Sequence, residues 1–208
     1  MNHGKAERRA GRGLGVALVC AMLAGCSITQ PDPDKGEFAI VVPAAGAAAQ
    51  PAPGTCLRVE RVRVAVPFNQ QSFMYRTGDS EFKTDYYNGF VAPPDRLLSG
   101  ATVKALSDRG AAATVLDPGM VVGCDRRLET SVTDLYADLR PTKNQVVIKA
   151  RFMLLRDSEG ATTILGDWPM EAAETMLSPS PADIAAAYGR AYASLMTRVT
   201  KQIAAVKP

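Results

Sequence analysis

Histidine is almost absent from this 208-residue sequence, which contains only His3. Without further histidines the chain cannot assemble a Ser-His-Asp or Cys-His catalytic group, or the usual histidine metal site. Neither a Walker-type phosphate loop nor a Gly-x-Ser-x-Gly motif occurs in the sequence. Asp134 and Asp138 leave an acid–base pair open, although acidic side chains on strands and loops are usually solvated. We therefore predict that the protein is not an enzyme and that it holds no metal or cofactor.

A surplus of charge is also missing once the N-terminal stretch is set apart. The whole chain carries 24 Lys and Arg residues against 21 Asp and Glu residues, a formal charge of +3. Residues 1–25 contain four of the basic residues and one of the acidic residues, so the remainder carries 20 of each. A formally neutral chain gives no support for nucleic acid as a partner, because nucleic-acid binding needs a basic patch or stripe.

The N-terminal stretch has the layout of a secretory signal peptide. It begins with Lys5, Arg8, Arg9 and Arg12 and continues with an apolar run over residues 14–23. That run is too short for a permanent transmembrane helix, which needs about 20 residues. A basic start followed by a short apolar run and small residues predicts export across the inner membrane.

The end of this stretch, Leu23-Ala24-Gly25-Cys26, resembles a bacterial lipobox. In proteins with that motif the cysteine thiol receives a diacylglyceryl group, the peptide is cut before the cysteine, and the new amine is acylated, for instance with palmitate. The resemblance therefore implies that Cys26 anchors the mature protein in a membrane. The alternative is an ordinary signal peptide in which the cysteine is incidental.

This interpretation divides the chain into three parts. Residues 1–25 form the lipoprotein signal peptide, and residues 26–54 form a lipidated tether with a short strand at 38–42. The tether is rich in proline, alanine and glycine, a composition typical of semi-extended linkers and loops without regular structure. Residues 55–208 are long enough for one folded domain.

Two cysteines remain beyond the anchor, Cys56 and Cys124. An even pair in an oxidising compartment favours a disulfide, which would close a long loop. Two buried free thiols are the alternative, because spacing in the sequence does not establish that the two residues are close in space.

Alternating apolar residues and turn residues predict a series of strands. The clearest covers residues 57–66, where the alternation slips by one residue near Glu60 and Arg61 and so indicates a β-bulge. Further strands are expected at 73–75, 81–90, 112–116, 128–136, 146–154 and 162–165.

Two helices complete the predicted fold. The first runs from about Asp95, a suitable capping residue, to Ser107. The second begins at Asp183 and carries one apolar stripe, which consists of Ile184, Tyr188, Ala191, Leu195, Val199 and Ile203. The order of elements indicates an α+β fold, with a single antiparallel-rich sheet and two main helices packed on one face.

Several of these features occur in an order that resembles a known family. They are the lipobox, the tether, Phe38-Ala39-Ile40, the strand ending at Pro67, Met74-Tyr75-Arg76, an aromatic stretch to Phe90, the first helix, a hairpin turning at Asp157-Ser158-Glu159-Gly160, and the amphipathic last helix. This order resembles the ABC-type transport auxiliary lipoprotein family, of the PqiC type. The family is associated with MCE-protein systems that move lipids between the two membranes of a Gram-negative envelope.

The resemblance implies a periplasm-facing lipoprotein that docks to an MCE-domain protein and is not the ATPase. Ser27 follows the anchor, where Asp would signal retention in the inner membrane, so we expect the outer membrane. Copies anchored in one membrane have a raised effective concentration, which favours a homo-oligomer as well. The alternative function is a solitary lipoprotein that binds a lipid or another apolar ligand in its own cavity.

Aromatic residues are concentrated between positions 68 and 90, which hold seven of the twelve Phe and Tyr residues. Interfaces favour aromatic side chains, so Tyr75, Tyr86, Tyr87 and Phe90 are candidate partner-binding residues. The competing interpretation is that the stretch packs the sheet onto the first helix. Tyr86 and Tyr87 are the pair from which we expect an exposed ring, because neighbouring strand residues face opposite ways.

Overall fold

The computed structural model describes residues 35–44, 46, 50, 54–120 and 122–206. Cys26 and the lipobox residues before it lie outside the described residues. The strands, in chain order, are β1 (Gly36–Phe38), β2 (Cys56–Val59), β3 (Arg63–Val64), β4 (Ser72–Arg76), β5 (Phe82–Phe90), β6 (Thr114–Leu116), β7 (Arg126–Asp138), β8 (Gln145–Ser158) and β9 (Ala161–Thr175). The helices are α2 (Pro94–Asp108) and α3 (Pro181–Ala205). The predicted α+β class is confirmed.

Within the described residues, all nine strands belong to one mixed sheet, at whose centre lies β7. On one side β7 pairs with β8 in antiparallel fashion, and β8 pairs with β9 in the same way. On its other side β7 pairs with β2, β3 and β4, all in parallel. Parallel neighbours need a long crossover connection, and the segment containing α2 supplies one between β4 and β7. The sheet is therefore mixed, and antiparallel pairing is confined to β7–β8–β9 and to β4–β5.

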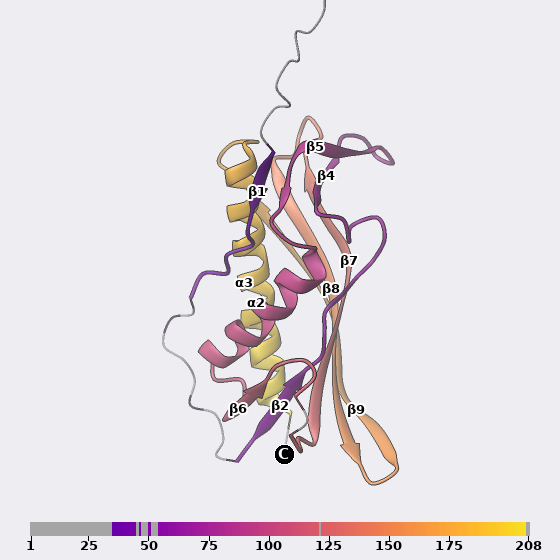
Figure 1. Ribbon diagram of the computed structural model, residues 1–208, viewed down its shortest axis with the longest axis vertical. Helices are drawn as coiled ribbons and strands as arrows, with labels where there is room; N and C mark the ends of the chain where they lie inside the picture. Colours follow the sequence, from indigo (N-terminus) through magenta and orange to yellow (C-terminus); the bar gives the residue numbers. More distant parts are fainter. Residues whose placement is uncertain (1–34, 45, 47–49, 51–53, 121, 207–208) are drawn as a thin grey trace, which may run out of the picture. The chain divides into compact units, whose positions relative to one another are not determined.

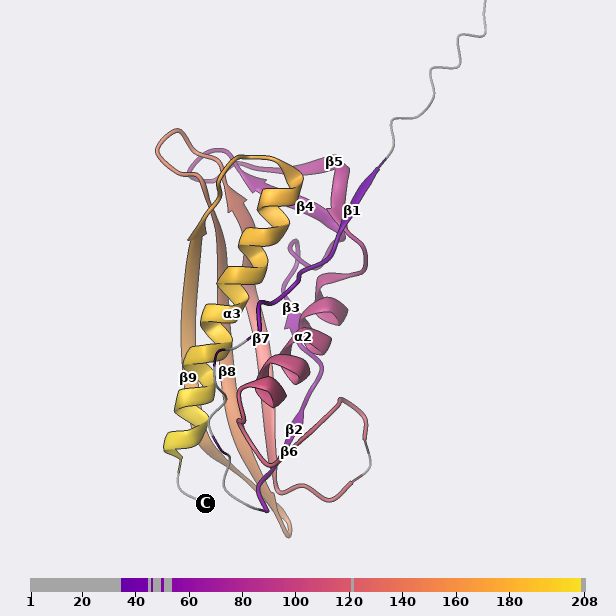
Figure 2. The same cartoon turned by 90° about the vertical axis from the view of Figure 1, so that its left-hand side faces the viewer.

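Both helices lie on the same side of the long strands β7, β8 and β9 (Figures 1 and 2). Helix α3 packs on β8 and β9, and α2 contacts α3 and the short strands β2, β3 and β6. The predicted stripe of α3 faces the sheet and is buried throughout. Its partners are the alternating side chains of β8, all buried: Val146, Ile148, Ala150, Phe152 and Leu154. The core thus forms where two apolar periodicities, 3.6 and 2, meet.

The predicted strand over residues 57–66 is divided into β2 and β3 by one inserted residue. Val59 pairs with Leu128, and Arg63 pairs with Ser131, so four steps on one strand match three on β7. The amide of Val62 leaves the sheet and donates to the hydroxyl of Ser99 on α2, at 2.9 Å. The slip in the alternation near residue 60 is therefore confirmed as an irregularity in the strand.

Both helices begin before their predicted starts, α2 at Pro94 instead of about Asp95 and α3 at Pro181 instead of Asp183. Ser180 caps α3, since its Oγ accepts from the amide of Asp183 at 3.2 Å. Helix α2 instead begins at Pro94, its N-cap is Pro93, and no side chain caps it. Asp95, predicted as the cap, lies in the first turn, because Pro94 is itself suited to the first helical position.

Strand β9 extends ten residues beyond the predicted end at residue 165, and β1 occupies Gly36–Phe38 instead of 38–42. Gly166 and Pro169 lie inside β9 and together resemble a turn in the sequence. Proline is tolerated there because β9 pairs with β8 alone and is an edge strand. Strand β1 pairs in parallel with the end of β5, and the chain then leaves the sheet to cross α3.

The free edge of β9 is covered by two arginines of α3. Arg190 donates to the backbone oxygen of Thr175 at 2.8 Å, and Arg198 donates to that of Glu171 at 2.7 Å. Unpaired strand edges promote association with other chains, so these contacts blunt the edge. In the described part of the chain, no helix has the length and apolar content needed to cross a membrane.

Candidate functional site

Strand β5 carries a bulge of several residues in the middle of the aromatic stretch. Ser72 of β4 pairs with Gly89, but Met74, only two residues later, pairs with Thr84. The residues in between are looped out around the carboxylate of Asp85. Its Oδ1 accepts from the backbone amides of Tyr87 at 2.8 Å and Asn88 at 3.0 Å. This local capture of backbone amides by an aspartate is the Asx-turn chemistry that competes with sheet pairing.

The bulge places two tyrosine rings in solvent. Tyr86 is 67% exposed and Tyr87 is 48% exposed. Their ring centroids lie 5.1 Å apart in an edge-to-face arrangement, and the Nζ of Lys35 lies 4.8 Å from the centroid of Tyr86. We expected at least one exposed ring from the alternation of strand residues. Both are exposed, because the bulge breaks that alternation.

Tyr75 and Phe90, the other two candidate partner-binding residues, support the bulge from inside. The hydroxyl of Tyr75 donates to Oδ2 of Asp85. Burial raises the pKa of Tyr75, and the neighbouring carboxylate raises it further. Phe90 is only 3% exposed and packs against Phe73 and Tyr188, with ring centroids 4.9 and 5.5 Å away. Phe90 was a candidate for partner binding, but in the structure it is a core residue, because the end of β5 turns toward α3.

The carboxylate of Asp85 holds the bulge together in its ionised form. Burial opposes its ionisation, but hydrogen bonds from Tyr75, Tyr87 and Asn88 outweigh burial and lower its pKa. The sequence prediction did not include Asp85. Its signal is the Asp-x-x-Asn-Gly pattern inside a strand, where a glycine indicates a bulge or a close backbone approach. A Cβ at Gly89 would lie 2.4 Å from the backbone oxygen of Gln71, which shows that approach.

The remaining aromatic residues of the stretch are used in packing. Phe73 belongs to the main core, where its ring centroid lies 6.3 Å from that of Tyr188 on α3, the last helix and not the first. Phe68 and Phe82 pack with Tyr136 on the face of the sheet opposite the helices, at centroid distances of 6.0 and 5.4 Å from Tyr136. The exposed pair of the aromatic stretch is therefore Tyr86 and Tyr87, while Phe82 is 39% exposed and packs against Tyr136.

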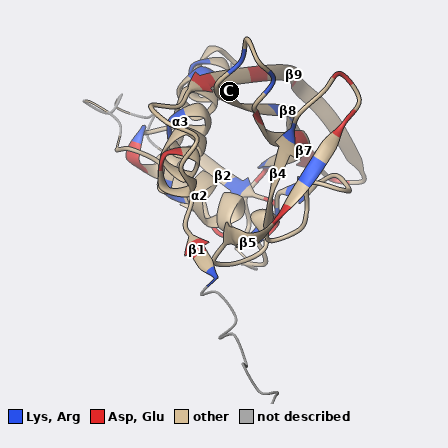
Figure 3. Ribbon diagram, turned by 90° about the horizontal axis from the view of Figure 1, so that it is seen from above, with Lys and Arg blue, Asp and Glu red and all other residues tan. Residues whose placement is uncertain are grey.

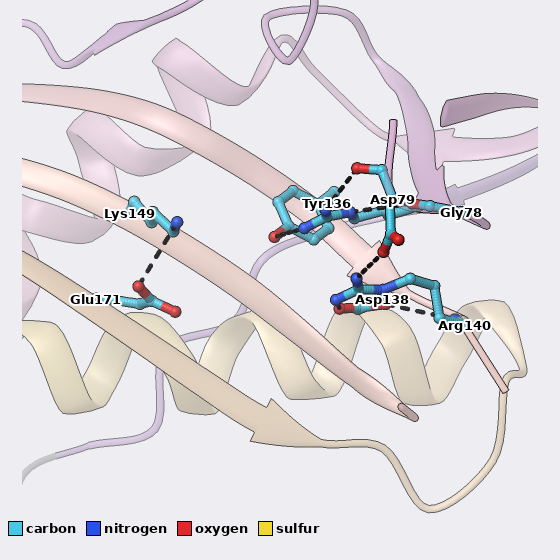
Figure 4. Close-up of polar contacts among 8 residues, drawn as sticks. Gly78, Asp79, Tyr136, Asp138, Arg140, Lys149 and Glu171 are labelled. Atoms are coloured by element: carbon cyan, nitrogen blue, oxygen red, sulfur yellow. Dashed lines mark hydrogen bonds and ion pairs between the residues drawn. The ribbon is translucent and has the colours of Figure 1, made fainter. Parts of the chain in front are cut away.

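Charged residues surround this end of the domain without a dominant sign, as the interspersed blue and red segments of Figure 3 show. One cluster joins the β4–β5 turn to the end of β7 (Figure 4). Arg140 donates two hydrogen bonds to the buried carboxylate of Asp138, at 2.9 and 2.8 Å, and a third to Asp79 at 2.9 Å. The hydrogen bonds from Arg140 outweigh burial and lower the pKa of Asp138.

These contacts remove Asp138 from the open acid–base pair. Its carboxylate is bound by Arg140, whereas that of Asp134 accepts from the hydroxyl of Thr133 at 2.9 Å. Farther along the open face of the sheet, carboxylates and cations pair across strands, as Lys149 and Glu171 do at 3.7 Å (Figure 4). Among the described residues, no group of three or more His, Cys, Asp or Glu side chains could hold a metal ion.

Cys56 and Cys124 form a disulfide, with their Cα atoms 5.5 Å apart. The bond joins the start of β2 to the loop that precedes β7. It lies at the end of β2 away from the aromatic bulge, so it is not part of the exposed tyrosine surface (Figure 1).

Comparisons with known proteins agree with the fold. The sequence model of a protein family, described as the ABC-type transport auxiliary lipoprotein component, matches residues 38–204. No curated protein matches the chain. The crystal structure of protein XCC0632 from Xanthomonas campestris, a protein of the domain family DUF330, is similar to it with a TM-score of 0.68 and 21% identity, over 78% of this chain and 91% of that one.

A second crystal structure, of an uncharacterised protein, gives a TM-score of 0.65 and 18% identity, over 82% of this chain and 99% of that one. At such identities the two structures support the fold alone. The family match runs from the last residue of β1 to near the end of α3, which is most of the chain. On that match, the chain belongs to the ABC-type transport auxiliary lipoprotein family.

Proposed function

We propose that this lipoprotein is a component of an MCE-type lipid-transport system and that it works by docking to an MCE-domain protein, without catalysis. The observation that carries the proposal is the pair of solvent-exposed rings, Tyr86 and Tyr87, held out of the sheet by Asp85. Membership of a transport auxiliary family supports a role as a subunit.

The geometry of the pair suits a protein interface. A tyrosine ring has few rotatable bonds and buries roughly 150–250 Å² when covered, so it gives large contact area for little lost entropy. The backbone beneath the rings is fixed by the hydrogen bonds to Asp85, and Lys35 adds a cation above one ring. A preorganised surface loses less conformational freedom on binding than a mobile loop.

The proposed location is the periplasmic face of the outer membrane, with the acyl chains on Cys26. Lys35, the first described residue, lies nine positions after Cys26, with eight residues between them. Nine extended residues span at most about 30 Å, so the tether keeps Tyr86 and its neighbours close to the anchoring membrane. Anchored copies share one surface, which supports a homo-oligomer around the partner.

The test is capture of the partner from membranes after chemical crosslinking, with wild-type protein and the variants Tyr86→Glu and Tyr87→Glu. Docking would bury the glutamate charge, so we expect each variant to lose capture of the MCE-domain protein. Membrane fractionation and the melting temperature should stay unchanged. Leu177→Glu is the matched control, because Leu177 is 90% exposed and lies before α3. Capture that survives glutamate at both tyrosines would remove this surface as the interface.

A solitary lipid carrier is the alternative, and it requires a wild-type protein that copurifies with lipid and with no protein. The described residues do line one mainly apolar groove, beside α2 and away from Tyr86 and Tyr87. Since the two sites are separate, lipid binding there and docking by the tyrosines do not exclude each other.

A further inference from the structure

An apolar groove of about 420 Å³ runs between α2 and the segment that follows β1. Apolar residues form most of its lining: Ile40, Val41, Val42, Pro43, Leu97, Ala101 and Ala105. Val41 is 72% exposed, although its side chain is aliphatic. The floor is open at Gly100, where an added Cβ would meet no atom within 4 Å. The volume lies in the range of small-molecule sites, roughly 300–1,000 Å³.

A buried cation lies in the wall of this groove. Arg109, at the C-terminal end of α2, is only 7% exposed. Its guanidinium donates to the backbone oxygens of Ala105 at 3.2 Å and Ala193 at 3.5 Å, and to the hydroxyl of Thr197 at 3.4 Å. All three acceptors are neutral, and no carboxylate among the described residues forms an ion pair with Arg109.

The charge of Arg109 is therefore only partly compensated. A helix C-terminus contributes about half a negative charge, and carbonyl oxygens satisfy donors without neutralising them. Arg96 and Lys104 also line the groove, against the single carboxylate of Asp108. That carboxylate is already taken by Lys104, 2.6 Å away. A buried charge is normally paired with an opposite charge. The groove therefore combines an apolar floor with a buried cation that has no anionic partner among the described residues.

We propose that the groove binds an amphiphile with one anionic group. The acyl chain would lie along Val41 and Leu97 over Gly100, and its carboxylate or phosphate would pair with Arg109. A free fatty acid and an anionic phospholipid share this chemistry. The inference goes beyond docking, because it concerns a different surface and requires no contact at Tyr86 or Tyr87.

Photocrosslinking tests the proposal on the full-length protein, purified from membranes and placed in phosphatidylcholine nanodiscs. The probes are palmitic acid, its methyl ester and phosphatidylglycerol, each with a diazirine in the acyl chain. They are added after purification, so that they cannot enter the anchor. Mass spectrometry then locates the labelled peptides. We expect palmitic acid, phosphatidylglycerol or both to label residues 40–43 and 97–105, with at least about tenfold less labelling by the uncharged ester.

Two variants separate the apolar and the ionic parts of the site. Gly100→Trp fills the floor and should abolish labelling of the groove by every probe. Gly123→Trp is its matched control, because an added Cβ at Gly123 also meets nothing within 4 Å. Arg109→Gln should remove the preference for the acid over the ester, even if it lowers the melting temperature.

Equal labelling by palmitic acid and its ester in the wild type would overturn the proposal. So would groove labelling that persists in Gly100→Trp. Neither result bears on the docking proposal, which is tested by capture of the MCE-domain protein with variants at Tyr86 and Tyr87.

Discussion

The backbone oxygen of Val41 lies directly over Gly189 of α3, and a Cβ built on Gly189 would stand 2.1 Å from it. The segment after β1 therefore crosses α3 at Gly189, the one residue of this helix that has no side chain. This contact fixes one wall of the groove beside α2. It also explains a glycine in the interior of a long helix, where glycine is otherwise unfavourable.

We predict opposite effects of alanine at two helical glycines. Gly189→Ala should lower the free energy of unfolding by about 1–3 kcal/mol, because the added methyl group collides with backbone that cannot rotate away. Gly100→Ala should raise it by about 0.4–1 kcal/mol, since α2 has open space there and alanine restricts the unfolded chain. Chemical denaturation of both variants measures the difference. Equal stability of the two would contradict the close contact at Gly189.

The predictable parts of the fold are those where one apolar periodicity acts alone. The stripe from Ile184 to Ile203 and the alternation of β8 both define buried faces, and both are buried as predicted. The one-residue slip near Glu60 was also visible, because a change of phase along a strand has few other causes.

The parts that could not be predicted depend on distant neighbours. Pro169 is acceptable in β9 only because no strand of the described residues pairs with the outer edge of β9. The exposure of both Tyr86 and Tyr87 depends on hydrogen bonds to Asp85, and the groove at Arg109 depends on where the chain after β1 crosses two helices. Such features arise from tertiary packing, which overrides local propensity.

Removal of the disulfide should destabilise the domain. Cys56 and Cys124 are 68 residues apart in sequence, and closing a loop of that length contributes about 4 kcal/mol on the chain-entropy model. We expect the double variant Cys56→Ala/Cys124→Ala to lose about 2–5 kcal/mol in denaturant titrations. Adding a reductant to the wild type should give the same loss and should not affect the double variant. A wild type that is insensitive to reduction would argue against a structural role for the bond.

Stability should fall in acid through Asp138. Its carboxylate has a pKa below the ordinary value of 3.8 when folded, so ionised Asp138 stabilises the fold above that value. The contribution is lost as the pH falls through the lowered pKa. Asp138→Asn should cost about 1–3 kcal/mol at neutral pH, and the gap to the wild type should close below about pH 4. Asp79→Asn is the control, because its side chain is 97% exposed and pairs with the same Arg140. A constant gap across this pH range would assign the cost to packing.

The last prediction concerns the membrane anchor. If Cys26 carries the acyl chains, these chains hold the mature domain at the membrane. Two or more acyl chains hold a protein firmly, at about 0.8 kcal/mol for each buried methylene, whereas one chain binds marginally. We therefore expect Cys26→Ala to move from the detergent-extracted membrane fraction to the soluble periplasmic fraction. Density-gradient separation of wild-type membranes should place the protein with the outer membrane, and Ser27→Asp should shift it to the inner membrane. A Cys26→Ala variant that still needs detergent for extraction would locate the anchor elsewhere, and it would remove the short tether on which the position of Tyr86 and Tyr87 near the membrane depends.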